Sequence, residues 1–173
     1  MEFYVPDIYK KSIHAIDYNK LKNNGIKCLL FDLDNTIVPF NEKVPPKKVI
    51  DLFKKVKDLG FKIIIFSNSG KRRLRPFKET LDVDCCTRAM KPSTKKFFKV
   101  LEEYHYNESE IAIIGDQIMT DVLGGNRTGI TTILINPISK KDFILTKFNR
   151  IREKKVIKKL SKLDLFYRGK YYG

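Results

Sequence analysis

Two carboxylates and a hydroxyl stand close together in the stretch Phe31-Asp32-Leu33-Asp34-Asn35-Thr36, which directly follows an apolar run. A carboxylate at the end of a buried strand can attack phosphorus if a cation suppresses the repulsion between the two anions. Asp32 is placed for that attack. Asp34 is close enough to donate a proton to the departing alkoxide and later to accept one from water. The stretch therefore predicts covalent chemistry on a phosphate ester.

Two later segments supply groups that this reaction still lacks. Ser67, in Phe66-Ser67-Asn68-Ser69, offers a hydroxyl donor to a phosphoryl oxygen. Lys91, which precedes a proline, brings a cation that offsets negative charge on the nucleophile and on the phosphoryl group. The catalytic residues that we expect are Asp32, Asp34, Ser67 and Lys91, and the expected substrate-binding residues are Thr36 and Asn68.

Further carboxylates predict a metal ion. Gly115-Asp116-Gln117 closes another apolar run, and Asp121 follows in the same loop. Hard oxygen ligands of this kind suit Mg²⁺, which binds a few carboxylates and keeps several of its waters. We expect Asp32 and Asp116 to be direct ligands and the backbone carbonyl of Asp34 to be a third. Asp121 is the remaining residue of the expected metal site.

Short apolar runs alternate along the chain with longer amphipathic runs, and turn residues separate them. This alternation is typical of a parallel sheet flanked by helices, in which ligands bind beyond the carboxyl ends of the strands. The predicted strands are 26–33, 61–66, 83–86, 111–114 and 131–135, and the predicted helices are 46–59, 71–81, 93–106 and 119–128. We therefore expect a five-stranded, mostly parallel α/β fold with the polar residues above at one edge.

Taken in order, these residues resemble the four motifs of the haloacid dehalogenase (HAD) superfamily of phosphohydrolases. The matching stretches are Asp-x-Asp-x-Thr at 32–36, the Ser67 motif, Lys91 before a proline, and Gly-Asp-x-x-x-x-Asp at 115–121. The resemblance implies a three-layer Rossmannoid fold, an aspartyl-phosphate intermediate on Asp32, Asp34 as general acid and base, and Mg²⁺ as cofactor. In this superfamily the residue at the position of Asp121 supports the metal site and is sometimes not a direct ligand.

Other stretches resemble the YqeG branch of this superfamily. They are 31–36, 115–117 and 120–127, together with Val5-Pro6-Asp7 near the start and Phe148-Asn149-Arg150 near the end. The branch is related to phosphatidylglycerophosphate phosphatases of the mitochondrial type. The resemblance therefore implies an anionic phospholipid as substrate, although members of the branch need not all share one.

The spacing of the motifs leaves no room for a large cap domain. About thirty residues separate Thr36 from Ser67, and fewer separate Ser67 from Lys91. An open site suits a phosphate presented on something large, such as a membrane, because small metabolites usually benefit from closure that excludes water. A soluble nucleotide or sugar phosphate is the alternative substrate.

The length of 173 residues and the 42% share of hydrophobic residues suit a single domain. Within it we expect an N-terminal arm at 1–25, a catalytic core at 26–139, and a basic helix with a poorly ordered tail at 140–173. The three cysteines show neither zinc nor disulfide spacing, and no apolar run could cross a bilayer or serve as a secretory signal. These features predict a cytosolic protein.

The net charge of +15 makes polyanions natural partners. Residues 140–173 hold twelve basic and three acidic residues and so carry +9 of the total. One interpretation is a basic amphipathic helix that rests on anionic lipid at the inner face of the membrane. Another is a solvated helix face that reflects compositional bias of the source organism. A third makes the protein a binder of nucleic acid or of the ribosome.

Overall fold

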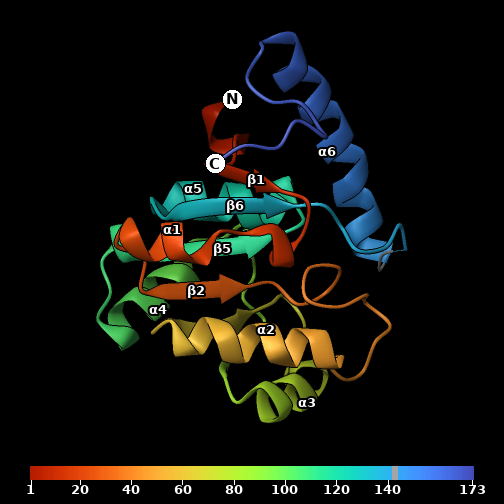
Figure 1. The fold of residues 1–173 in the computed structure, drawn as a ribbon. Helices are drawn as coiled ribbons and strands as arrows, with labels where there is room; N and C mark the ends of the chain where they lie inside the picture. The colour runs from red at the N-terminus through yellow and green to blue at the C-terminus, as the bar shows by residue number, and fades with distance from the viewer. Residues whose placement is uncertain (142–143) are drawn as a thin grey trace.

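A computed structural model describes residues 1–141 and 144–173, and a parallel sheet of six strands lies at its centre (Figure 1). The strand order is β1-β6-β5-β2-β3-β4. The strands are β1 (Ile8–Lys10), β2 (Cys28–Phe31), β3 (Lys62–Phe66), β4 (Asp84–Cys86), β5 (Ile111–Gly115) and β6 (Thr131–Ile135). The strands β2, β3, β4 and β6 fall in the ranges that the sequence predicted, and β5 extends one residue beyond its range, so the α/β class is confirmed.

Helices cover both faces of the sheet and give the three layers expected. α1 to α3 contribute to the core cluster on one face, and α4 packs on the other. Their bounds are α1 (Tyr18–Asn23), α2 (Lys47–Asp58), α3 (Lys71–Leu81), α4 (Lys95–Tyr104), α5 (Leu123–Thr128) and α6 (Ile144–Lys162). Short 3₁₀ turns lie at Glu2–Tyr4, Ile13–Ala15 and Glu108–Glu110, and a π-helical turn at Ile118–Val122 leads into α5.

The two central strands explain where a ligand can bind. All residues of β2 and β5 are buried, as their unbroken apolar sequences require. β3 and β4 lie on one side of β2, whereas β5 and β6 lie on the other. The carboxyl ends of β2 and β5 therefore form the topological switch point at which open α/β sheets bind ligands.

The segments between the strands are short. The chain runs from β2 through α2 to β3, and from β3 through α3 to β4. Within residues 1–141, which the structure describes in full, no separate folded unit is inserted into either connection. The expectation that a large cap is absent is confirmed.

The N-terminal arm differs from the prediction, because it supplies a sixth strand. β1 pairs in parallel with β6 at the edge of the sheet. Asp7 Oδ2 accepts a hydrogen bond from the backbone N–H of Thr132 at 2.8 Å and another from its hydroxyl at 3.1 Å. A strand of three residues is too short to show an alternating pattern, so the pairing becomes visible only in the fold.

The C-terminal tail also differs from the prediction, because it packs against β1. Phe166 is 2% exposed, and its ring centroid lies 5.2 Å from that of Tyr9. Tyr9 and Tyr172 exchange two backbone hydrogen bonds of 3.0 Å each. The basic helix predicted within 140–173 is observed as α6, while Asp142 and Phe143 lie outside the described residues.

We expect Phe166→Ala to lower the free energy of unfolding by about 3–5 kcal/mol, because it removes a buried aromatic ring and leaves a cavity. Denaturant titration would measure the loss. Leu165→Ala is the matched control, since Leu165 is 42% exposed and its truncation should change stability by less than about 0.5 kcal/mol. Equal denaturation midpoints for the two variants would contradict the packing of the tail against β1.

Candidate active site

Two carboxylates extend from neighbouring strands at the topological switch point. Asp32 follows β2 and Asp116 follows β5, and the N–H of Asp32 donates to the carbonyl of Ile114 at 2.9 Å. The backbone then turns at Asn35, whose φ of 61° lies in the left-handed region that asparagine tolerates. This turn brings the Thr36 hydroxyl to 3.3 Å from Asp32 Oδ2 and 3.2 Å from Asp116 Oδ1.

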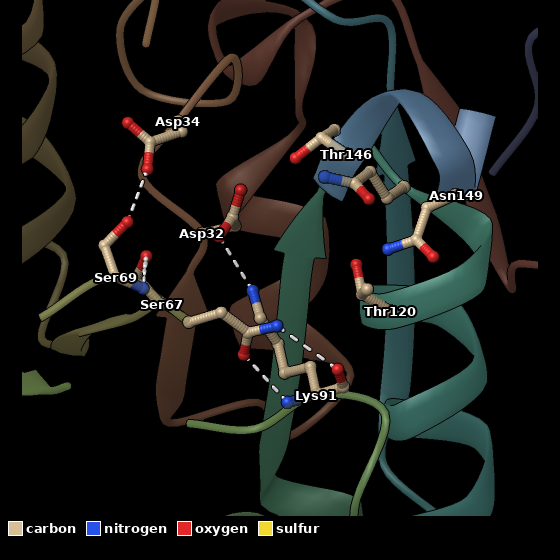
Figure 2. Close-up of a pocket in the computed structure, with 10 residues that line it drawn as sticks. Asp32, Asp34, Ser67, Ser69, Lys91, Thr120, Thr146 and Asn149 are labelled. Carbon is tan, nitrogen blue, oxygen red and sulfur yellow. Dashed lines mark hydrogen bonds and ion pairs between the residues drawn. The ribbon is translucent and has the colours of Figure 1, made fainter. Parts of the chain in front are cut away.

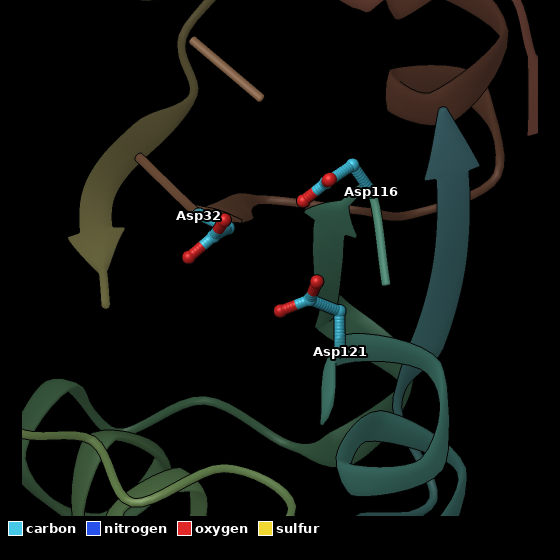
Figure 3. Close-up of side chains that lie close together, drawn as sticks. All are labelled: Asp32, Asp116 and Asp121. Atoms are coloured by element: carbon cyan, nitrogen blue, oxygen red, sulfur yellow. The ribbon is translucent and has the colours of Figure 1, made fainter. Parts of the chain in front are cut away.

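Asp121 completes a cluster of three buried carboxylates (Figure 3). One oxygen from each of Asp32, Asp116 and Asp121 lies within 4.8 Å of the others. The most exposed of the three residues, Asp32, is only 7% exposed. Carboxylates so close together and so well shielded from water repel one another strongly, and nearby cations are needed to offset this repulsion.

Local structure explains how Asp121 reaches this cluster. It lies in the π-helical turn Ile118–Val122, and π-turns occur frequently at functional sites. The N–H of Gln117 donates to Asp121 Oδ2 at 3.1 Å. A Cβ at Gly115 would lie 2.1 Å from the carboxyl carbon of Asp121. Glycine at the end of β5 therefore allows the Asp121 side chain to cross the end of that strand.

Lys91 is a buried cation that contacts two of the three carboxylates. Its Nζ donates to Asp32 Oδ1 at 2.7 Å, to Asp121 Oδ1 at 2.6 Å and to the carbonyl of Phe66 at 3.0 Å. Burial disfavours the charged ammonium, but Asp121 and Asp32 outweigh that effect and raise the pKa of Lys91. Burial also raises the pKa of Asp32, and the charge of Lys91 only partly offsets that rise.

Asp32 and Lys91 line a cavity of about 350 Å³, and residues from the Ser67 motif line it as well (Figure 2). Lys91 N–H donates to Asn68 Oδ1 at 2.8 Å, and Asn68 Nδ2 donates to the Lys91 carbonyl at 3.2 Å. Ser67 Oγ accepts a hydrogen bond from the N–H of Ser69 at 3.2 Å. Asn68 therefore holds the Lys91 loop in place, whereas the substrate contact expected from the sequence stays a prediction.

The Asp34 side chain lines this cavity but points away from Asp32 and toward Ser69 (Figure 2). Ser69 Oγ donates to Asp34 Oδ2 at 2.8 Å, and Arg73 donates to Oδ1 from Nε at 3.1 Å and from Nη2 at 2.9 Å. Sequence reasoning missed both partners. Arg73 belongs to the basic run 71–75, which resembles an exposed helix face, and only the fold turns this one side chain toward Asp34.

The C-terminal helix α6 also contributes to the site. Thr146 and Asn149 line the cavity (Figure 2). Arg150 Nη1 donates to the backbone carbonyl of Asp116 at 3.0 Å, and its Nη2 contacts Asp116 Oδ2. Burial raises the pKa of Asp116, and Arg150 partly offsets the rise. The sequence connected Arg150 only with the branch resemblance, because no spacing links α6 with the end of β5.

Comparison with known proteins gives the relatives of this chain. A family model described as “Mitochondrial PGP phosphatase” matches residues 1–139. “Probable phosphatase YqeG” of Bacillus subtilis is 36% identical over 161 residues, which cover 93% of this chain and 94% of that protein. “Phosphatidylglycerophosphate phosphatase 1, chloroplastic/mitochondrial” of Arabidopsis thaliana is 30% identical and covers 87% of this chain. The matched region is only 46% of that longer protein.

Solved structures share the fold. A Legionella pneumophila protein described as a HAD superfamily (subfamily III A) hydrolase superposes with a TM-score of 0.53 at 17% identity, over 71% of each chain. This likeness shows a HAD-like fold, whereas the family model and the Bacillus relative define the class of protein as a phosphatase, a phosphoric monoester hydrolase. The chain belongs to the mitochondrial PGP phosphatase family.

We expect Lys91→Met to lower the free energy of unfolding by about 3–5 kcal/mol, because it leaves buried carboxylates without their shared cation. Denaturant titration in the presence of EDTA would measure the loss. Lys99→Met provides the control, since Lys99 lies exposed on α4. A loss no greater than that of the control would mean that Lys91 does not balance the charge of the cluster.

Proposed function

We propose that this protein hydrolyses phosphate monoesters with the help of Mg²⁺ and that Asp32 carries the phosphoryl group between two steps. The observation that carries the proposal is the cluster of three carboxylates within 4.8 Å, formed at the ends of neighbouring strands. Lys91 contacts two of its members, Asp32 and Asp121. A nucleophile, a cation and candidate metal ligands are thereby brought together at the ends of these strands.

The donor set fits Mg²⁺. Three carboxylates lie within reach of one ion, and the two cations that contact them, Lys91 and Arg150, leave the cluster negative. Mg²⁺ prefers such oxygen ligands, and Asp32, Asp116 and Asp121 would hold it with the backbone carbonyl of Asp34. When bound, Mg²⁺ would neutralise charge on the phosphoryl oxygens and lower their repulsion of the nucleophile.

In the first step, the carboxylate of Asp32 forms a bond to phosphorus while the bond to the ester oxygen breaks. Asp34 donates a proton to the departing alkoxide. Water then attacks phosphorus, Asp34 accepts a proton from it, and the bond between Asp32 and phosphorus breaks to release phosphate. The two steps balance, since the proton that Asp34 gives up is restored by the water.

Two further groups act on the phosphoryl oxygens, and two others control Asp34. The Ser67 hydroxyl and the Lys91 ammonium stabilise the charge of the phosphoryl group. Ser69 and Arg73 hold the Asp34 carboxylate, so its side chain must rotate away from them to reach the leaving group. The Thr36 hydroxyl bridges Asp32 and Asp116 and is a further contact for the substrate.

The favoured substrate is an anionic phospholipid such as phosphatidylglycerophosphate. Family membership supports this choice, as does the Arabidopsis relative, which is named a phosphatidylglycerophosphate phosphatase. The absence of an inserted unit among residues 1–141 also supports it, because an open site can reach a phosphate that projects from a lipid surface.

The outer side of α6 is the surface that would rest on that lipid. No helix in the part of the chain that the structure describes has the length and apolar character to span a bilayer. Phe148 and Ile151 are 65% and 55% exposed, and Lys155 and Lys159 are exposed on the same side of the helix. Apolar and basic side chains together suit peripheral contact with anionic lipid, next to the cavity that Thr146 lines.

We expect Asp32→Asn to abolish Mg²⁺-dependent phosphate release, because the amide cannot act as the nucleophile. Asp34→Asn should slow release by about 10²–10⁴-fold through loss of the general acid and base. The assay measures inorganic phosphate released from phosphatidylglycerophosphate dispersions and from soluble nucleotide and sugar phosphates, with and without EDTA. Asp58→Asn, on the exposed surface of α2, is the control and should keep full activity.

A wild-type rate in Asp32→Asn would overturn the mechanism. Turnover of soluble phosphates without turnover of the lipid would leave the mechanism intact and favour the alternative substrate.

We expect the protein to float with phosphatidylglycerol vesicles and not with phosphatidylcholine vesicles. Replacing both Lys155 and Lys159 by Gln should weaken binding roughly 30-fold at low salt, at about 1 kcal/mol for each lysine. Lys54→Gln with Lys55→Gln makes the same charge change on α2 and is the control. Deletion of the whole segment would be uninformative, because it also removes Phe166 from the core. Equal recovery with both kinds of vesicle would count against lipid contact.

A further inference from the structure

The side of α6 that faces the site contacts the carboxylate cluster through Arg150. Its guanidinium binds both the backbone and the side chain of Asp116. Nη1 donates to the Asp116 carbonyl at 3.0 Å, and Nη2 contacts Asp116 Oδ2. A planar guanidinium that binds two acceptors fixes the position of both. Arg150 is therefore able to set the rotation of the Asp116 carboxylate relative to its backbone.

Glu153 holds Arg150 in that position. Glu153 is 1% exposed and forms an ion pair with Arg150 at 3.5 Å and another with Arg168 from the tail. It also accepts a hydrogen bond at 3.0 Å from the N–H of Ile118, in the π-helical turn. A buried carboxylate with three partners ties α6, the tail and the loop after β5 into one unit.

The two oxygens of Asp116 face different neighbours. Oδ1 lies 3.2 Å from the Thr36 hydroxyl, which in turn lies 3.3 Å from Asp32 Oδ2, so Oδ1 is on the side of Asp32. Oδ2 lies against Arg150. A carboxylate held in this way can offer one oxygen to a metal ion while the guanidinium keeps the other, which is how neighbouring groups orient metal ligands in many sites.

We infer that Arg150 is a positioning residue that fixes the Asp116 carboxylate for the metal ion, so that α6 is part of the active site. The inference rests on the proposed metal site. It assigns a role to a residue outside the region 1–139 that the family model matches. It also gives the inner side of α6 a role separate from the lipid contact of the outer side.

An alternative role for Arg150 predicts the opposite change in metal affinity when this residue is removed. If its guanidinium occupied the place of the metal ion, the two cations would compete, and removing Arg150 would tighten metal binding. A positioning residue has the reverse effect, because its loss frees the carboxylate to rotate and typically weakens metal binding about 10–100-fold. The direction of the change in metal affinity therefore distinguishes the two roles.

The experiment is a titration of the full-length protein with Mn²⁺, in which electron paramagnetic resonance measures the unbound ion. We expect Arg150→Ala to raise the Kd by at least about 10-fold and Arg150→Lys to raise it by less, because lysine keeps the charge but loses the paired contact. The Mg²⁺ concentration for half-maximal hydrolysis of p-nitrophenyl phosphate should shift in the same order. Arg127→Ala, which removes an exposed arginine from α5, should bind Mn²⁺ as the wild type does.

An Arg150→Ala protein that binds Mn²⁺ as tightly as the wild type, or more tightly, overturns the inference. If that variant does not fold, Arg150→Lys decides, and a Kd within about two-fold of the wild-type value overturns the inference. A wild-type protein that binds no Mn²⁺ would overturn the proposed metal site itself. Because this titration does not depend on turnover, it separates the two failures.

Discussion

Three carboxylates share a small buried volume at the ends of β2 and β5, and their mutual repulsion is the constraint around which the rest of the site is arranged. Water cannot screen these charges, so cations must come from the protein or from a bound ion. Lys91 enters from the loop after β4 and contacts Asp32 and Asp121, whereas Arg150 enters from α6 and contacts Asp116. The two protein cations balance only part of the charge, and the remaining negative charge suits the divalent ion that we propose.

The C-terminal segment links this electrostatic balance with the stability of the fold. Leu160 and Phe166 are buried in a core cluster that also includes residues of β1 and β6. Packing of the tail therefore fixes the position of α6, and the position of α6 places Arg150 against Asp116. The opposite side of the same helix carries exposed apolar and basic side chains, so one element combines a role inside the site with a surface suited to lipid.

Asp32 and Asp34 have different contacts, and the difference bears on the two chemical roles that we propose for them. Asp32 lies in the buried cluster, where Lys91 holds it, while Asp34 lies at the edge of the cavity with Ser69 and Arg73. A nucleophile needs a fixed position, whereas a group that exchanges protons with a leaving group and then with water must be able to move. In the mechanism that we propose, Asp32 can therefore react from the position in which Lys91 holds it, whereas Asp34 must first leave its contacts with Ser69 and Arg73.

The sequence by itself determined the α/β class, the ranges of strands β2 to β6 and the candidate residues Asp32, Lys91 and Asp116. Buried strands, helices and strand-end motifs leave local patterns, and parallel strands bring their carboxyl ends to one edge. Only the tertiary structure decided that 8–10 forms a sixth strand, that the tail packs on it, and that Arg73 and Arg150 contact Asp34 and Asp116. Those contacts join residues far apart in the chain, and they depend on how the elements pack, which no local spacing encodes.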